Sequence, residues 1–169
     1  EFFSSIKILR KYVHPKSLNE IEKRPKHPEK VLENHIVVFG SDRMGGKIVD
    51  YLKDKGQRFV VVEHNPEIVK RLSKRGIYCV YGDAENDDVL RKVGMYRAKL
   101  IIVTIPDSEI SCFVVKRAKR FNPKAKVFAR AHTAMDAENL YNCKADFVVV
   151  PEFVSSEKIV RKVESFLRK

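Results

Sequence analysis

Short apolar segments recur along the chain from residue 35 and alternate with longer amphipathic segments. The apolar segments are rich in Val and Ile and lack polar alternation, which is typical of strands covered on both faces of a parallel sheet. They predict strands at residues 35–40, 58–63, 77–81, 99–104, 126–131 and 146–150. Helices are expected near residues 44–55, 66–75, 86–93, 108–121, 134–142 and 153–168. Right-handed crossovers between such strands give a doubly wound α/β sheet of about six strands.

The first 34 residues have a different pattern. Apolar residues recur at helical spacing at Phe2, Ile6, Leu9 and Val13, with basic residues among them. This pattern predicts a short amphipathic helix that ends at a proline. Residues 14–34 are charged, contain prolines and have few apolar positions, so they predict a linker. Because the chain begins without methionine, we expect it to be a piece of a longer protein.

The stretch 35–63 carries the clearest chemical signal. An apolar strand enters the turn Gly40-Ser41-Asp42-Arg43-Met44-Gly45-Gly46, a helix follows, and a second strand ends at Glu63. This layout is typical of a Rossmann-like dinucleotide-binding unit. Gly40 allows the tight turn and Gly45 allows close packing, while the helix N-terminus attracts a phosphate. Glu63 is placed to accept hydrogen bonds from ribose hydroxyl groups, which disfavours the 2′-phosphate of NADP.

Asp42 departs from this pattern, because it occupies the position of the middle glycine. Its carboxylate would repel a pyrophosphate, which favours a mononucleotide such as AMP over NAD. Three alternatives stay open at this point. The site has lost its ligand, the turn is a Rossmann turn that never bound one, or Glu63 is simply an exposed acid at a strand end.

The other strand ends supply the remaining candidates, because ligands of doubly wound sheets lie beyond the carboxyl ends of the strands. Asn65 and Pro66 predict a helix entry, with Asn65 as the cap. Asp83 is a candidate cap for the helix near Asn86. The predicted binding residues are Gly40, Ser41, Asp42, Arg43, Met44, Gly45, Glu63, His64, Asn65, Gly82, Asp83, Ala84, Thr104, Ile105, Pro106 and Arg130.

The net charge of +12 fits either nucleic acid or an anionic membrane surface as a neighbour. The basic cluster at Lys116, Arg117, Lys119 and Arg120 lacks the interleaved aromatic residues of a base-stacking surface. We therefore expect a solvated helix face and no nucleic-acid partner. No apolar run approaches the length of a transmembrane helix, so the chain itself is not expected to span a membrane.

The three cysteines, at 79, 112 and 143, show no metal-ligand spacing. Cys79 and Cys112 fall in apolar segments, which predicts core residues in a reducing compartment, and we expect no disulfides. Gly46-Lys47 is not a P-loop, because the spacing is too long and Ile48 replaces the magnesium ligand. No catalytic set can be assembled, so we predict a protein that is not an enzyme and holds no metal.

The strand-end motifs together resemble the RCK domain, also called KTN or TrkA-N. They are Gly82-Asp83-Ala84, Thr104-Ile105-Pro106-Asp107, Ala129-Arg130-Ala131 and the segment from Ala145 to Glu152. The resemblance covers residues 35–169. It implies a cytosolic regulatory module of potassium channels and cation:proton antiporters, with the Gly82 turn beside the adenine. It also implies a homodimer in which the last helix crosses to the neighbour.

The resemblance suggests three regions. Residues 1–34 would be a juxtamembrane helix and linker, residues 35–152 the RCK domain, and residues 153–169 the crossover helix. Phe153, Ile159, Val160, Val163, Phe166 and Leu167 form the apolar stripe of that last helix. Some channel members of the family have acids along the end of the fifth strand that bind calcium. Arg130 and His132 stand there in this chain, so no calcium site is expected at these positions.

The expected function is regulation of a Kef-type antiporter for potassium or sodium, at the cytoplasmic face of the cell membrane, through binding of AMP, ADP or NAD(H). The first alternative is the regulatory domain of a potassium channel or of a Trk/Ktr-type uptake system. The second is a soluble NAD-dependent oxidoreductase, for which the chain has no room for a substrate domain.

Overall fold

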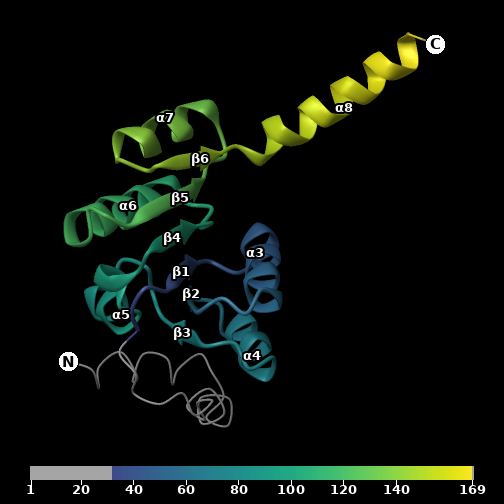
Figure 1. Cartoon of the computed structure of the whole chain (residues 1–169). Helices are drawn as coiled ribbons and strands as arrows, with labels where there is room; N and C mark the ends of the chain where they lie inside the picture. Colours follow the sequence, from purple (N-terminus) through teal and green to yellow (C-terminus); the bar gives the residue numbers. More distant parts are fainter. Residues whose placement is uncertain (1–31, 169) are drawn as a thin grey trace, which may run out of the picture.

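The computed structural model describes residues 32–168, so the predicted amphipathic helix and nearly all of the linker lie outside the described residues. Its centre is a parallel sheet of six strands in the order β3-β2-β1-β4-β5-β6 (Figure 1). The strands are β1 (Ile36–Phe39), β2 (Phe59–Glu63), β3 (Cys79–Tyr81), β4 (Leu100–Val103), β5 (Lys126–Arg130) and β6 (Phe147–Val149). The predicted Rossmann-like fold is confirmed, and the strand order reverses direction at β1, between β2 and β4.

Helices cover the two faces of the sheet unequally. The helices are α3 (Arg43–Asp54), α4 (Pro66–Lys74), α5 (Asp87–Lys92), α6 (Ser108–Phe121), α7 (Ala134–Asn142) and α8 (Pro151–Leu167), with the short 3-10 helix η1 (Met95–Arg97) before β4. Helices α3 and α4 lie on one side of the sheet, and α5, α6 and α7 lie on the other (Figure 1). Helix α8 extends away from the rest of the domain, and none of its residues is buried. No helix within residues 32–168 is long and apolar enough to cross a membrane.

Strands β1, β2 and β4 are largely buried because each of them contributes side chains to two cores. In β1, Val37 and Phe39 belong to the core under α5, α6 and α7, whereas Ile36 and Val38 belong to the core under α3 and α4. Side chains that alternate between two covered faces leave no polar position in the strand. This arrangement explains why hydrophobicity alone located the strands.

Side-chain caps fix where most helices begin. Asn65 accepts hydrogen bonds from the N–H groups of Glu67 and Ile68, and Pro66 is the first residue of α4, as predicted. The prediction that Asp83 caps α5 is wrong. Asn86 is the cap and accepts from the Asp88 N–H, while Asp83 accepts from the Glu85 N–H at 3.1 Å within the preceding turn.

The prediction that the chain has no disulfide is also wrong. Cys112 in α6 and Cys143 at the end of α7 form a disulfide, with 5.8 Å between their Cα atoms. They are 31 residues apart in the sequence. Only the packing of α6 beside α7 brings them together, and the sequence does not reveal that packing.

The basic cluster on α6 is only partly a solvated face. Lys116 and Arg120 are exposed. Arg117 pairs with Asp87 of α5 at 3.0 Å, and Lys119 reaches Asp146, which precedes β6, at 2.5 Å. Half of the cluster therefore ties α6 to neighbouring elements.

Asp146 anchors the beginning of β6. Partial burial would raise the pKa of its carboxyl, but hydrogen bonds from Lys119, Lys126 and the Val127 N–H outweigh burial and lower the pKa to about 2. The carboxylate therefore joins α6 and β5 to the last strand of the sheet.

His35 is a buried polar residue directly before β1. Its side chain is fully buried, and its Nε2 lies 2.8 Å from the carbonyl oxygen of Val93, while Nδ1 has no hydrogen-bond partner among the described residues. Burial, only partly opposed by this hydrogen bond, lowers the pKa of His35 from its ordinary value of 6.5. His35 is thus neutral at pH 7, with its proton on Nε2.

We predict that the free energy of unfolding falls as the pH drops below about 6.5. The unfolded chain protonates His35 at its ordinary pKa, whereas the folded chain binds that proton only at lower pH, so acid favours the unfolded state. Urea unfolding at pH 7.5 and 5.5 measures the difference. His35→Gln should flatten the dependence on pH, and the exposed His132→Gln should not. An equal slope in wild type and His35→Gln would contradict the assignment.

Candidate functional site

A cavity of about 380 Å³ opens at the carboxyl ends of the strands, near β1, where the order of the strands in the sheet reverses. A volume of this size lies within the range of small-molecule sites. The residues predicted from the strand ends all line it, namely Gly40, Ser41, Asp42, Arg43, Met44, Gly45, Glu63, His64, Asn65, Gly82, Asp83, Ala84, Thr104, Ile105, Pro106 and Arg130. The structure therefore brings the whole predicted set together, although their role in binding stays a prediction.

The first wall of the cavity is the turn between β1 and α3. Gly40 has a φ of +83°, a conformation that side chains rarely adopt. A Cβ atom at Gly45 would collide with the carbonyl oxygen of Gly40 and the hydroxyl of Thr104. Both glycines are required so that α3 can start directly against the strand ends.

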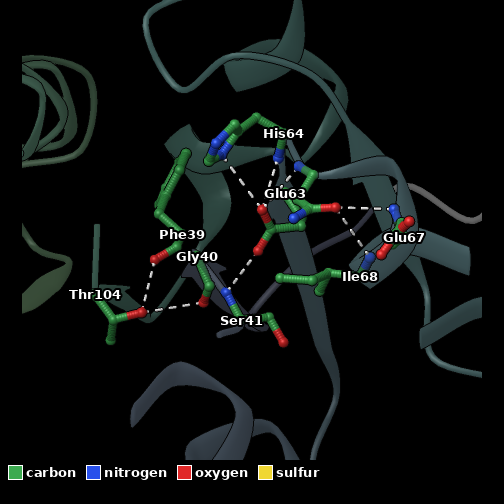
Figure 2. Close-up of polar contacts among 9 residues, drawn as sticks. Phe39, Gly40, Ser41, Glu63, His64, Glu67, Ile68 and Thr104 are labelled. Carbon is green, nitrogen blue, oxygen red and sulfur yellow. Dashed lines mark hydrogen bonds and ion pairs between the residues drawn. The ribbon is translucent and has the colours of Figure 1, made fainter. Parts of the chain in front are cut away.

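The second wall is Glu63, and its carboxylate organises the site (Figure 2). Oε2 accepts a hydrogen bond from the Ser41 N–H at 2.8 Å. Oε1 accepts from the N–H groups of His64 and Asn65 at 2.9 and 3.0 Å. Only 3% of the Glu63 side chain is exposed. A buried carboxylate is tolerable here because backbone donors replace the lost water.

This geometry decides between two interpretations of Glu63. It is not an exposed acid at a strand end, so that alternative is wrong. A carboxylate offers about four acceptor positions, and the three backbone bonds leave one of them, on Oε2, for a hydroxyl group in the cavity. Glu63 can therefore hold the turn and still receive one hydrogen bond from a ligand.

The N-terminus of α3 is poised for an anion. Asp42 occupies the cap position but makes no side-chain hydrogen bond to the helix, and the first turn has no acidic residue. The Ser41 hydroxyl is buried and has no partner among the described residues. Unsatisfied N–H groups, a positive helix dipole and a free hydroxyl together favour a phosphate at this end of the cavity.

Asp42 and Arg43 stand at the mouth of the cavity, and both side chains are largely exposed. Arg43 Nε lies 3.8 Å from Asp42 Oδ2. Such an exposed pair is weak, so Arg43 remains available to a phosphate. The Asp42 carboxylate still opposes a second phosphate at the same place.

Thr104 and Asp107 set the position of the loop that follows β4. The Thr104 hydroxyl lies 3.1 Å from the carbonyl oxygens of both Phe39 and Gly40, which joins the ends of β4 and β1. Asp107 caps α6 by accepting from the N–H groups of Glu109 and Ile110. Ile105 and Pro106 are held between these two anchors and line the cavity.

Arg130 closes the cavity from the end of β5. Only 11% of its side chain is exposed, and its Nη2 lies 3.3 Å from His132 Nδ1. A guanidinium in this position carries five donors and a permanent positive charge. It therefore complements an anion inside the cavity.

Three apolar residues of the lining were not predicted. Ile68 and Ile110 are each the third residue of a helix that begins at a strand end, and Val62 precedes Glu63. The signal for the two isoleucines was present, because each follows a capping Asn65 or Asp107 by three positions. These side chains give the cavity an apolar wall on which a flat ring can pack.

Cys79, whose thiol is affected by the charge of Glu63, is not a nucleophile. Burial, with a smaller effect of Glu63, raises the pKa of Cys79 to about 12, so its thiol stays protonated. Within residues 32–168, no group of three or more His, Cys, Asp or Glu side chains is placed to hold a metal ion.

Comparison with known proteins decides the family. The sequence profile of the TrkA-N domain matches residues 36–151. The chain belongs to the TrkA-N domain family. The resemblance drawn from the strand-end motifs is thereby confirmed.

The named relatives of this TrkA-N domain include potassium channels and antiporters. Potassium channel protein 1 of Methanocaldococcus jannaschii is 28% identical over 78% of this chain and 40% of its own length. A glutathione-regulated potassium-efflux system protein of Haemophilus influenzae is 26% identical over 87% of this chain and 24% of its own length. The putative cation/proton antiporter YbaL of Escherichia coli is 29% identical over 70% of this chain and 21% of its own length. This chain thus spans less than half of each relative.

Solved structures share the fold. The crystal structure of the TrkA-N domain of YbaL from Escherichia coli aligns with a TM-score of 0.74 and 27% identity, covering 77% of this chain and 96% of that one. The Kef C-terminal domain of Shewanella denitrificans, solved in an AMP-bound form, aligns with a TM-score of 0.71 and 22% identity over 80% and 82%. The GsuK channel bound to NAD aligns with a TM-score of 0.67 and 20% identity over 86% and 26%.

Proposed function

We propose that this TrkA-N domain binds an adenine nucleotide in the strand-end cavity and that occupancy of the cavity regulates a cation:proton antiporter in the same polypeptide. The proposal rests mainly on one observation, which is that a candidate phosphate site and a candidate ribose site line the same cavity. The uncapped N-terminus of α3 offers a phosphate site, and the buried Glu63 keeps one acceptor position for a ribose hydroxyl.

The three parts of a nucleotide fit three parts of the lining. The phosphate would lie at the α3 N-terminus, with Arg43 and Arg130 as cationic partners. The ribose would donate a hydrogen bond to Glu63. The adenine would pack in the part of the cavity bordered by Gly82, Asp83 and Ala84. A ligand that binds one conformation more tightly shifts the protein toward it, and this shift is the regulatory output.

The choice among nucleotides follows from charge. Asp42 opposes a pyrophosphate at the turn, so AMP should bind more tightly than ADP or NAD(H). The 2′-phosphate of NADP would meet the buried carboxylate of Glu63, so NADP should not bind. The AMP-bound Kef domain and the NAD-bound GsuK channel support a nucleotide in this fold.

The membrane partner is inferred from the relatives. Their names describe channels, efflux systems and an antiporter, which supports a regulatory domain on the cytoplasmic side of the membrane rather than an enzyme. The second candidate is the regulatory domain of a potassium channel, favoured by the 28% identity to potassium channel protein 1. The sequence that adjoins this segment in the whole protein distinguishes the two.

We predict that AMP, ADP and NAD(H) raise the thermal midpoint of the domain and that NADP(H) does not, because only a ligand of the native state stabilises it. Differential scanning fluorimetry with each compound is the measurement. Glu63→Gln should weaken AMP binding by about tenfold or more, since it removes a charge-assisted hydrogen bond. Each variant is compared with its own unliganded midpoint, because Glu63→Gln also loosens the turn.

Glu67→Gln is the matched control, because Glu67 is an exposed acid four residues after Glu63, in α4, and does not line the cavity. It should bind AMP as the wild type does. The proposal fails if AMP, ADP and NAD(H) all leave the wild-type midpoint unchanged at millimolar concentration.

We also infer that the domain is a homodimer in which α8 packs on the partner subunit. Phe153, Ile159, Val163 and Phe166 are exposed along α8. Exposed apolar residues in such a row are unusual for a monomer.

A complementary apolar surface lies on the sheet. Phe128 of β5 and Phe147 of β6 are also exposed and contact each other edge to face, with ring centroids 5.4 Å apart. Helices α3 and α4 stop short of this part of the sheet (Figure 1). A two-fold dimer would place each α8 over the Phe128–Phe147 pair of the partner, which satisfies both surfaces at once.

Sedimentation analysis tests this dimer with two variants of α8. Ile159→Asp should dissociate it, because the new charge would lie in the apolar contact. Ser165→Asp adds the same charge to the opposite side of α8 and should leave the dimer intact. Truncation after Glu152 should give a folded monomer. A dimer that survives both Ile159→Asp and the truncation would place the interface elsewhere.

A further inference from the structure

Arg130 stands between the candidate nucleotide cavity and the first turn of α8. It is the last residue of β5 and pairs with Val149, the last residue of β6. The Ala131 N–H donates to the Val149 carbonyl at 2.8 Å, so the ends of the two strands are held side by side. Helix α8 begins two residues after Val149. The backbone therefore fixes Arg130 beside the junction of β6 and α8.

The guanidinium uses this position to contact α8. Its Nη2 lies 3.9 Å from Oε1 of Glu152, the second residue of the helix. Arg130 also lines the cavity. Glu152 is more than half exposed, whereas Arg130 is nearly buried. The same Nη2 also lies 3.3 Å from His132 Nδ1, but an imidazole carries no negative charge. Because a nearly buried cation needs a partner of opposite charge, Glu152 and an anion in the cavity compete for the Arg130 guanidinium.

We propose that Arg130 is a shared anion-binding residue, held by Glu152 when the cavity is empty and by the phosphate of a bound nucleotide when it is filled. Occupancy then releases the first turn of α8. The inference rests on the proposed nucleotide function and adds the connection between the cavity and the helix that leaves the domain.

Charge makes the two anions compete. A phosphate carries more negative charge than a carboxylate and accepts two parallel hydrogen bonds from a guanidinium. A phosphate at Arg130 would also repel the Glu152 carboxylate, so the two cannot share the cation without cost. The nucleotide therefore favours the conformation in which Glu152 has moved away.

Helix α8 is suited to respond, because none of its residues is buried within its own subunit. Val150, directly before it, is buried. The N–H groups of Phe153 and Val154 lie 3.1 and 3.4 Å from the Val150 carbonyl oxygen and define the first turn. When Glu152 moves away from Arg130, the backbone would therefore change only at the junction of β6 and α8. Because α8 is a continuous helix, this local change would reorient the whole helix. By linkage, a partner that fixes α8 would change nucleotide affinity by the same factor.

Isothermal titration of AMP into the complete chain tests the competition. Glu152→Gln should strengthen AMP binding by about two- to fivefold, the size of a partly exposed ion pair, because Arg130 is no longer held by a carboxylate. Arg130→Gln should weaken binding by about tenfold or more. In the double variant, Glu152→Gln should have no further effect, because the group through which it acts is absent. Glu157→Gln, which removes the same charge from α8 next to Arg161, is the control and should bind as wild type.

Hydrogen exchange at Phe153 and Val154 gives a readout that does not depend on affinity. AMP should accelerate exchange of these amides in the wild type. Glu152→Gln should already exchange rapidly without AMP and change little when AMP is added.

The outcomes separate this inference from the proposed function. If AMP binds wild type and Glu152→Gln equally and leaves exchange at Phe153 and Val154 unchanged, the coupling through Arg130 is wrong and nucleotide binding stands. An effect of Glu152→Gln that persists in the Arg130→Gln background also overturns the coupling. If no adenine nucleotide binds the wild type, the proposed function fails and the inference fails with it.

Discussion

The buried carboxylate of Glu63 is the contact on which the geometry of the strand-end cavity depends. It accepts hydrogen bonds from the turn after β1, through Ser41, and from the entry to α4, through His64 and Asn65. A carboxylate suits this role because both of its oxygens accept and neither donates. A glutamine would turn one acceptor into a donor that faces backbone N–H groups. The domain thus has a preformed cavity, in which the residue that holds the turn is also the one that meets the ribose in our proposal.

Much of this arrangement could be predicted from the sequence, because the relevant information is local. Uninterrupted Val and Ile segments marked the strands, and the carboxyl ends of parallel strands must meet at one edge of the sheet. The residues after each strand could therefore be collected into one site before their contacts were known. Asn65-Pro66 likewise specified a helix start within a few residues.

The sequence-based predictions were wrong where a contact depends on packing between distant segments, or where a neighbouring residue of similar chemistry takes the predicted role. Cys112 and Cys143 form a disulfide because α6 lies beside α7, and nothing near either cysteine signals that contact. Asp83 was a reasonable helix cap, but Asn86 lies closer to the first turn and takes that role. The burial of Glu63 follows from the fold of three segments around it, whereas a pattern of residues shows only that it ends a strand.

Regulation requires a connection between the rigid strand-end cavity and α8, which has few contacts within its own subunit. The cavity is built from strand ends and capped helices, whereas α8 has no buried residue within the domain. Arg130 belongs to both regions, because it lines the cavity and contacts Glu152. A ligand can shift the orientation of α8 only to the extent that it binds two conformations of the protein with different affinity. Arg130 provides such a difference in our proposal, because it pairs with Glu152 in one conformation and with the nucleotide phosphate in the other.

In our proposal, an adenine nucleotide occupies the cavity between α3 and Glu63. The most direct measurement is an amide NMR titration of the ¹⁵N-labelled chain with AMP. If AMP binds in this cavity, the largest shifts will occur at the amides of residues 40–45, at His64 and Asn65, and at residues 82–84, with saturation at a single affinity. Shifts that concentrate on other surfaces, or a spectrum unchanged at millimolar AMP, would contradict the account.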